Sequence, residues 1–166
     1  LRYVEDLQLN RTLPDVIRSE ISEHTTYTQA HSYGSRTRSF IKVQDGCDYK
    51  CSFCTIPLAR GGSRSATRDS ILQEAESLLL EGVLEIVLTG VNTGDFGIND
   101  SGQRVDHFIH LLTNLDEVGI PRIRISSIEP NLCHEEIIHF IAESNHVMPH
   151  LHMPLQSGSD HMLSLM

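Results

Sequence analysis

Short strand-like segments alternate with longer helix-like segments from residue 39 onward, and this alternation constrains the fold more than any other feature. Apolar residues repeat at helical spacing between the strand-like segments, and Gly82 follows the first such run as a stop signal. Repeated β-strand and α-helix units imply a parallel sheet with right-handed crossovers. The predicted strands are 39–44, 85–89, 122–126 and 150–153, and the predicted helices are 71–79, 108–115, 137–141 and one that begins within 158–166.

Polar and apolar residues alternate in all four predicted strands, so one face of the sheet is polar throughout. A parallel sheet with helices on both faces should instead have wholly apolar strands. The alternation predicts a curved, barrel-like sheet with helices on its outer apolar face and a polar lumen for a ligand; a water-facing α+β sheet is the alternative. The 166 residues fall short of the ~200 to 250 of a closed eight-unit barrel, so we expect an α/β fold, a partial, open (β/α) barrel truncated after about four βα units. The polar residues of the alternation are Lys42, Gln44, Glu85, Thr89, Arg122, Arg124, His150 and His152.

Residues 1–38 carry scattered charge and Pro14 but no sustained periodicity, which predicts a linker or arm with a short helix near residues 14–21. Residues 39–166 hold the βα units and form the predicted domain. No apolar stretch approaches the ~20 residues of a membrane span, and the first residues lack the basic-then-apolar order of a signal peptide. We therefore expect a cytoplasmic protein.

Three of the four cysteines, Cys47, Cys51 and Cys54, crowd one loop directly after the first predicted strand. This crowding indicates metal ligands in a reducing compartment rather than a disulfide scaffold, and the carboxyl end of a strand is where α/β barrels place their active sites. Three thiolates satisfy three irons of a 4Fe-4S cluster and leave one iron open. The alternative is a structural zinc site, although no second pair of ligands follows at the usual spacing. Cys133 stands apart from the motif.

Lys and Arg number 13 against 22 Asp and Glu, a net charge of −9, which argues against strong nucleic-acid binding by this segment alone. The balance reverses around the cysteines, where only Asp45 and Asp48 are acidic. These positive charges either balance an anionic cluster or also attract an anionic substrate or an acidic electron donor. The basic residues of this stretch are Arg36, Arg38, Lys42, Lys50, Arg60, Arg64 and Arg68.

Residues 44–54, with Phe53 just before the last cysteine, resemble the radical S-adenosylmethionine superfamily, and residues 55–65 look like its methylthiotransferases. Three further segments, 88–94, 122–130 and 151–159, are most similar to the branch that acts on threonylcarbamoyladenosine beside the tRNA anticodon. The resemblance covers residues 36–166. It implies a radical SAM barrel whose cofactors are S-adenosylmethionine and a 4Fe-4S cluster held by Cys47, Cys51 and Cys54.

The resemblance also implies where S-adenosylmethionine binds. Gly90 lies at a strand end and either lets the backbone approach the cofactor or makes a turn. Glu129 either binds cofactor or substrate hydroxyls or caps the next helix. The superfamily's Gly-Gly-Glu is replaced here by Thr-Gly-Val-Asn at 89–92, so its contacts do not carry over directly. The expected cofactor-binding residues are Phe53, Gly90, Ser127, Glu129, Gln156 and Ser157, the last two where the superfamily contacts the ribose.

The implied reaction replaces a C–H bond of the adenine ring with a methylthio group, with S-adenosylmethionine as both methyl donor and radical source. No side chain is assigned as a catalyst because the cofactor carries the hard step. The implied partners are tRNA and an electron donor such as a flavodoxin or ferredoxin. The family's N-terminal domain, which binds a second 4Fe-4S cluster, and its RNA-binding domain are expected outside this chain, so 39–166 is an incomplete domain. Alternatives are a methylthiotransferase for isopentenyladenosine in tRNA or for a ribosomal-protein aspartate, or a non-catalytic iron–sulfur or zinc protein.

Overall fold

The computed structural model describes residues 20–30, 32 and 38–166. Most of the predicted arm, including residues 14–19 of its expected helix and Arg36, lies outside these residues. Within them, the segment before the domain contains one 3-10 turn, η1 (Ile21–Glu23). It then runs along the edge of the sheet, where Lys42 N–H donates to the Ala30 carbonyl (3.0 Å) and Ser32 N–H donates to the Phe40 carbonyl (3.2 Å).

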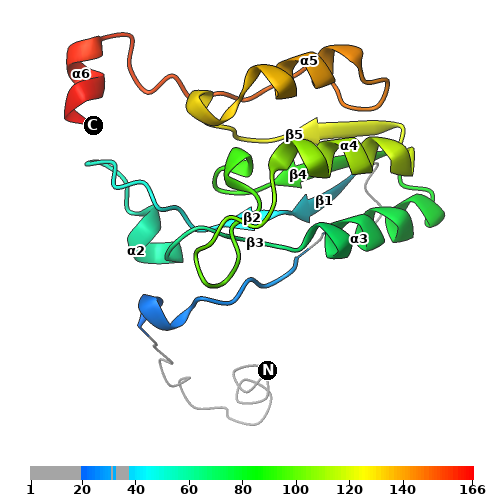
Figure 1. The fold of residues 1–166 in the computed structure, drawn as a ribbon, viewed down its shortest axis with the longest axis horizontal. Helices are drawn as coiled ribbons and strands as arrows, with labels where there is room; N and C mark the ends of the chain where they lie inside the picture. The colour runs from blue at the N-terminus through cyan, green and yellow to red at the C-terminus, as the bar shows by residue number, and fades with distance from the viewer. Residues whose placement is uncertain (1–19, 31, 33–37) are drawn as a thin grey trace, which may run out of the picture.

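Three parallel strands form the main sheet in the order β1 (Ser39–Lys42), β4 (Glu85–Thr89) and β5 (Arg122–Ile125) (Figure 1). The predicted α/β fold with a parallel sheet is therefore confirmed. Among the described residues the sheet stays open, and no closed barrel forms. Longer helices follow the strands as the periodicity predicts: α3 (Arg68–Leu80), α4 (Phe108–Val118) and α5 (Glu135–Glu143), with the shorter α6 (Asp160–Leu165) last.

Local sequence signals set the helix boundaries. Thr67 begins α3 by accepting a hydrogen bond from Ser70 N–H, as an N-cap residue does. The predicted stop at Gly82 holds, since this residue has a φ of +84° that favours glycine. Gly119 ends α4 in the left-handed conformation of a C-cap glycine. Each crossover thus returns promptly to the next strand.

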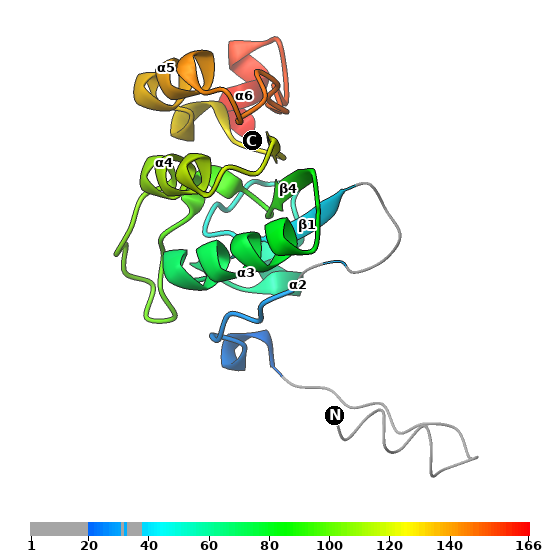
Figure 2. The ribbon, with the colours of Figure 1, turned by 90° about the vertical axis from the view of Figure 1, so that its right-hand side faces the viewer.

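The core lies between the apolar face of the sheet and the helices. Ile41, Ile86, Leu88, Ile123 and Ile125 are buried in one cluster with the inner faces of α3 and α4. Figure 2 shows α3 and α4 on the same side of β1 and β4. The alternating polar residues of the other face remain at least partly exposed in the three strands. The predicted alternation thus holds in three strands, although Phe40 and Val87 share the polar face and Gln44 is buried.

The first predicted strand, 39–44, is in fact divided. The main sheet keeps only Ser39–Lys42, and Gln44–Asp45 forms β2, which pairs antiparallel with β3 (Arg64–Ser65). Val43 makes the transition: its N–H still donates to the Thr89 carbonyl (2.8 Å), while its carbonyl accepts from Ala66 N–H (3.1 Å). One residue therefore belongs to both ladders, which the alternating pattern alone does not reveal.

The fourth predicted strand, 150–153, is wrong. The segment makes only an isolated parallel bridge, between Ser127 and His152. Pro149 and Pro154 flank the segment, and proline cannot donate to a ladder. His150 N–H instead donates to the Met148 carbonyl (2.7 Å) in a tight turn. The alternation of residues 150–153 therefore does not yield a regular strand.

Glu85 ties the sheet together on its polar side. Its carboxylate contacts Arg122 Nε (3.0 Å), directly opposite on β5, Arg124 Nε (3.2 Å) and Arg38 Nη1 (3.7 Å). Burial alone would raise the pKa of Glu85, but the hydrogen bond from Arg122 and the charges of Arg124 and Arg38 outweigh it and lower the pKa. The ionised carboxylate therefore stabilises the folded state.

We expect Glu85→Gln to lower the free energy of unfolding by about 1 kcal/mol at neutral pH. Because the folded-state pKa is depressed, this contribution is complete above the ordinary carboxyl pKa of ~4.3 and disappears as the pH falls through the folded-state value. Denaturant unfolding at several pH values measures the difference. Glu76→Gln, on the exposed side of α3, is the control. A difference that is constant down to pH 2 would contradict the assignment.

Candidate cofactor site

The cysteine loop follows β2 and lies at the carboxyl end of the parallel strands (Figure 1). Cys47, Cys51 and Cys54 are free thiols, each partly exposed. Cys47 N–H donates to the Gly61 carbonyl and Cys54 N–H to the Cys51 carbonyl, both at 3.0 Å. These bonds close the loop on itself and present the thiols at its surface.

Gly46 makes the start of this loop possible. It has a φ of +72°, and a Cβ atom there would lie 2.0 Å from the Gly62 carbonyl oxygen. Asp48 Oδ1 accepts from Ser63 N–H (3.0 Å) beside the same contact. The backbone just before the cysteines is therefore pressed against residues 61–63, which follow α2 (Ile56–Arg60).

Asp45 organises the positive charge around the loop. This buried carboxylate contacts Lys42 Nζ (3.3 Å), Arg60 Nη1 (3.4 Å) and Arg64 Nη2 (3.5 Å), and it accepts from Gly46 N–H (2.9 Å). One negative charge among three positive ones leaves a net positive charge around Asp45, two residues before Cys47. An iron–sulfur cluster held by three thiolates carries negative charge, so this setting fits it.

The surroundings of Cys47 disfavour its free thiolate. Burial raises the pKa of Cys47, and the charges of Asp95, Cys51 and Cys54 raise it further against the hydrogen bond at Tyr49. Thiolates that repel one another are stabilised by metal cations placed among them. Among residues 20–30, 32 and 38–166, however, no three His, Cys, Asp or Glu side chains converge on a position for a single metal ion. The ligand assignment thus stays a prediction, supported by the donor chemistry.

Hydrogen bonds connect the cysteine loop with the ends of the other strands. Gln44 Oε1 accepts from Asn92 N–H (2.9 Å) after β4, and Asn92 Oδ1 accepts from Glu129 N–H (3.2 Å) after β5. Asn131, in η3 (Pro130–Leu132), donates to the Tyr49 hydroxyl (2.8 Å). Sequence reasoning missed Gln44 and Asn92 as site residues. The only signal for Gln44 was the polar alternation of residues 39–44. The only signal for Asn92 was its place in Thr-Gly-Val-Asn, which replaces the superfamily's Gly-Gly-Glu.

The structure brings Gly90 and Glu129 toward the cysteine loop. Gly90 packs against Gln44, and the Glu129 carboxylate makes no hydrogen bond or ion pair within the described part of the chain. Ser127 Oγ lies 2.9 Å from His152 Nδ1, and Phe53 is 54% exposed beside the last cysteine.

Gln156 and Ser157 lie in the exposed connection before α6 and share no hydrogen bond with the other predicted site residues among those described. Gln156 has a φ of +61°, which is uncommon for a residue with a side chain and marks a constrained turn. The end of α6 does reach the cysteine loop: Ser52 N–H donates to the Met166 carbonyl (2.9 Å), and Ser52 Oγ donates to the Leu165 carbonyl (3.2 Å).

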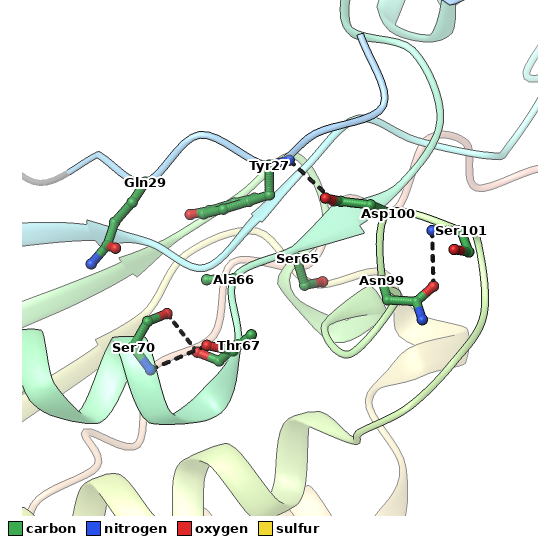
Figure 3. A pocket seen from close by; sticks show the side chains of 9 residues that line it. All are labelled: Tyr27, Gln29, Ser65, Ala66, Thr67, Ser70, Asn99, Asp100 and Ser101. Carbon is green, nitrogen blue, oxygen red and sulfur yellow. Dashed lines mark hydrogen bonds between the residues drawn. The ribbon is translucent and has the colours of Figure 1, made fainter.

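A cavity of about 430 Å³ lies away from these residues, between the segment before β1, the start of α3 and the turn at 99–101 (Figure 3). Most of its lining residues carry a hydroxyl or amide group, and Tyr27 N–H donates to Asp100 Oδ1 (3.1 Å) at its margin. None of the predicted site residues lines it. Its lining residues are Tyr27, Gln29, Ser65, Ala66, Thr67, Ser70, Asn99, Asp100 and Ser101.

The parallel sheet and the cysteine loop at its carboxyl edge define a class of α/β domain that carries its chemistry above the strand ends. The sequence profile of the radical SAM superfamily matches residues 41–166, and the chain belongs to this superfamily. The predicted resemblance is confirmed. Membership supports a 4Fe-4S cluster and S-adenosylmethionine as the cofactors of the domain.

The relatives are methylthiotransferases. The chain is 36% identical over 99% of its length to the threonylcarbamoyladenosine tRNA methylthiotransferase MtaB of Bacillus subtilis, covering 36% of that protein. It is 39% identical over 87% of its length to a putative methylthiotransferase of Helicobacter pylori (34% of that protein). It is 37% identical over 98% of its length to the tRNA-2-methylthio-N(6)-dimethylallyladenosine synthase of Legionella pneumophila (36%). The chain thus spans about a third of the length of these relatives.

Solved structures agree on the fold. The radical S-adenosylmethionine methyltransferase TsrM of Kitasatospora setae, solved with cobalamin and a [4Fe-4S] cluster, aligns with a TM-score of 0.59 at 21% identity. The alignment covers 75% of this chain and 23% of that one. No helix in the described residues has both the length and the apolar character needed to cross a bilayer.

We expect Gly46→Ala to prevent cluster assembly because the new Cβ would collide with the Gly62 carbonyl. Gly102→Ala is the matched control: Gly102 has nearly the same φ, +73°, but a Cβ there meets nothing within 4 Å. Both variants carry the cost of a left-handed alanine, about 1 to 2 kcal/mol. Iron content and visible absorbance after anaerobic reconstitution distinguish them. Equal iron content in the two variants would contradict the role given to the Gly46 contact.

Proposed function

We propose that this chain is the S-adenosylmethionine-binding domain of a tRNA methylthiotransferase that acts on threonylcarbamoyladenosine next to the anticodon. The observation that carries the proposal is the loop of three cysteines at the carboxyl end of the strands, directly after the buried Asp45 and its three cations, in a chain similar to methylthiotransferases. A tRNA substrate also supports the expected cytoplasmic location. A flavodoxin or ferredoxin is the proposed electron donor.

Cys47, Cys51 and Cys54 would hold the cluster, and the open iron would be available to S-adenosylmethionine. When bound, the cluster supplies the electron that starts the radical chemistry. The remaining residues bind and orient: Glu129 offers a carboxylate without a partner in the described chain, and Gly90 keeps the strand end free of a side chain. Phe53, Ser127, Gln156 and Ser157 complete the proposed cofactor-binding set.

A second substrate has comparable support. The chain is as similar to the dimethylallyladenosine synthase of Legionella pneumophila as to MtaB of Bacillus subtilis. Isopentenyl (dimethylallyl) adenosine in tRNA is therefore the runner-up. The two proposals require the same cofactors and differ only in the chemical group attached to the target adenine.

The substrate test uses the full-length protein, reconstituted anaerobically with iron, sulfide and a reductant. We expect deoxyadenosine to be released from S-adenosylmethionine, and tRNA bearing threonylcarbamoyladenosine to gain a methylthio group, detected by mass spectrometry of its nucleosides. A tRNA bearing dimethylallyladenosine is the matched alternative substrate. Methylthiolation of that tRNA alone would replace the first substrate with the second. Absence of deoxyadenosine from a brown, iron-containing protein would favour the non-catalytic alternative, and a colourless zinc protein would exclude the cluster.

The ligand assignment predicts that alanine at Cys47, Cys51 or Cys54 abolishes cluster binding, because the loop holds no spare cysteine or histidine. Cys133 is buried in the core and follows η3, where it packs as a small apolar side chain. Cys133→Ser should keep its iron and change stability by roughly 0.5 to 3 kcal/mol. Iron and sulfide analysis of the four variants is the measurement. A full cluster in Cys51→Ala, or cluster loss in Cys133→Ser, would show that the ligands are wrongly assigned.

A further inference from the structure

A buried amide joins the cysteine loop to the turn after β4. Gln44 is fully buried, although polar side chains are seldom buried without a complete set of partners. Its Nε2 donates to the Gly46 carbonyl (2.7 Å) and the Ser63 hydroxyl (2.9 Å), and it lies 3.1 Å from the Asp45 carbonyl. Its Oε1 accepts from Asn92 N–H (2.9 Å). One side chain thus holds both the beginning of the cysteine loop and a segment 48 residues further along the chain.

The turn after β4 is built to receive this side chain. A Cβ atom on Gly90 would lie 3.0 Å from Gln44 Oε1 and 3.2 Å from Gln44 Cβ, which is tighter than side chains normally tolerate. Glycine at position 90 therefore lets the Gln44 amide pass to Asn92. This contact gives Gly90 a role in positioning that does not depend on direct contact with a cofactor.

Asn92 extends the connection to β5. It is 3% exposed, and its Oδ1 accepts from Glu129 N–H (3.2 Å). Its Nδ2 is buried and has no hydrogen-bond partner among the described residues. An unpaired buried donor costs roughly 1 to 3 kcal/mol. Aspartate at this position would bury a charge with one donor beside it, which costs more than an unpaired amide donor, so asparagine suits this buried contact with Glu129 N–H.

We propose that Gln44 is a positioning residue that fixes the cysteine loop relative to the turn at Gly90–Asn92, and so sets the affinity of the site for S-adenosylmethionine. The inference rests on the proposed function only in placing that cofactor between the two segments. Groups that bind one ligand from two loops must be held to within about 0.5 Å by buried neighbours. Without the amide, each loop keeps its own backbone bonds but loses its connection to the other.

Gln44→Met tests the proposal because methionine is unbranched, has a similar length and adapts to its surroundings, but it can make none of the amide's hydrogen bonds. The full-length protein is reconstituted anaerobically. We expect its iron content to stay near wild type, since all three cysteines remain. We expect its affinity for S-adenosylmethionine, measured by calorimetry, to fall about tenfold or more. The change that S-adenosylmethionine causes in the electron paramagnetic resonance spectrum of the reduced cluster should shrink in parallel.

Ser144→Ala is the matched control for stability. Ser144 Oγ donates to Asp116 Oδ1 and accepts from His146 N–H (3.1 Å) and Val147 N–H (2.8 Å), so its loss removes three hydrogen bonds, against four for the Gln44 amide. These bonds lie near the amino end of β5, where Met148 N–H donates to the Ile123 carbonyl, at the opposite end of the sheet from the cysteine loop. This variant should lose stability but bind S-adenosylmethionine as wild type does.

Ser63→Ala provides a milder perturbation that leaves Gln44 in place. It removes one acceptor of the Gln44 amide, and we expect a two- to fivefold loss of affinity. The loss should not add to that of Gln44→Met in the double variant, because both act through the same side chain. Wild-type affinity and spectra in both single variants would overturn the proposal. So would iron loss in Gln44→Met together with wild-type affinity in Ser63→Ala, because the amide would then support folding alone.

The response of the wild-type protein distinguishes a failure of the proposed cofactor site from a failure of the role given to Gln44. If it shows no spectral change with S-adenosylmethionine, the proposed cofactor site fails, and the role of Gln44 fails with it. If the wild type responds and the variants respond equally, only the role of Gln44 fails. Methylthiolation of tRNA does not enter this comparison, so a wrong substrate leaves the test intact.

Discussion

The site depends on the way the chain leaves the main sheet at Val43. This buried residue donates its N–H to Thr89 in the parallel sheet and accepts at its carbonyl from Ala66, next to the antiparallel pair of β2 and β3. The change of partner turns the backbone out of the main sheet over a single residue. Gln44 and Asp45 are then buried beneath the cysteine loop instead of continuing a strand. Neither the amide bridge nor the charge cluster at Asp45 could form if β1 continued to residue 44.

The chain is acidic overall, but basic residues gather around the buried carboxylate of Asp45. The whole chain carries a net charge of −9, yet Asp45 is surrounded by three cations within 3.5 Å. Much of the remaining positive charge is paired too: Arg68 contacts Asp106, and Arg38 contacts Glu85. Several basic residues thus serve the structure in pairs, while the excess charge around Asp45 and the exposed Lys50 in the cysteine loop are not neutralised by ion pairs among the described residues.

Periodicity predicted the parts of the fold in which local signals and packing agree. The strand at 85–89 and the helices over α3, α4 and α5 have one apolar face each, and the structure buries those faces together. The predicted strand at 150–153 does not form, because an alternation of only four residues is a weak signal, and Pro149 and Pro154 flank it. The cysteine spacing predicted the site, and the structure places the three cysteines in a loop at the carboxyl end of the strands. The bridge from Gln44 to Asn92 was missed because a contact across 48 residues leaves no pattern in either segment.

The relatives of this chain are named for two different modified adenosines. The chain is 36% identical to MtaB of Bacillus subtilis and 37% identical to the dimethylallyladenosine synthase of Legionella pneumophila, so sequence identity favours neither substrate. Under the proposed function, the cysteine loop, the Asp45 cluster and the sheet would serve chemistry that both reactions need, so they bear on the cofactor rather than on the base. Discrimination between the two bases requires contacts with the group attached to the adenine. Within the hydrogen-bonded frame of Gln44, Asn92 and Glu129, the Gln44 amide is fully paired inside the chain, whereas the Glu129 carboxylate has no partner in the described residues and is available to a ligand.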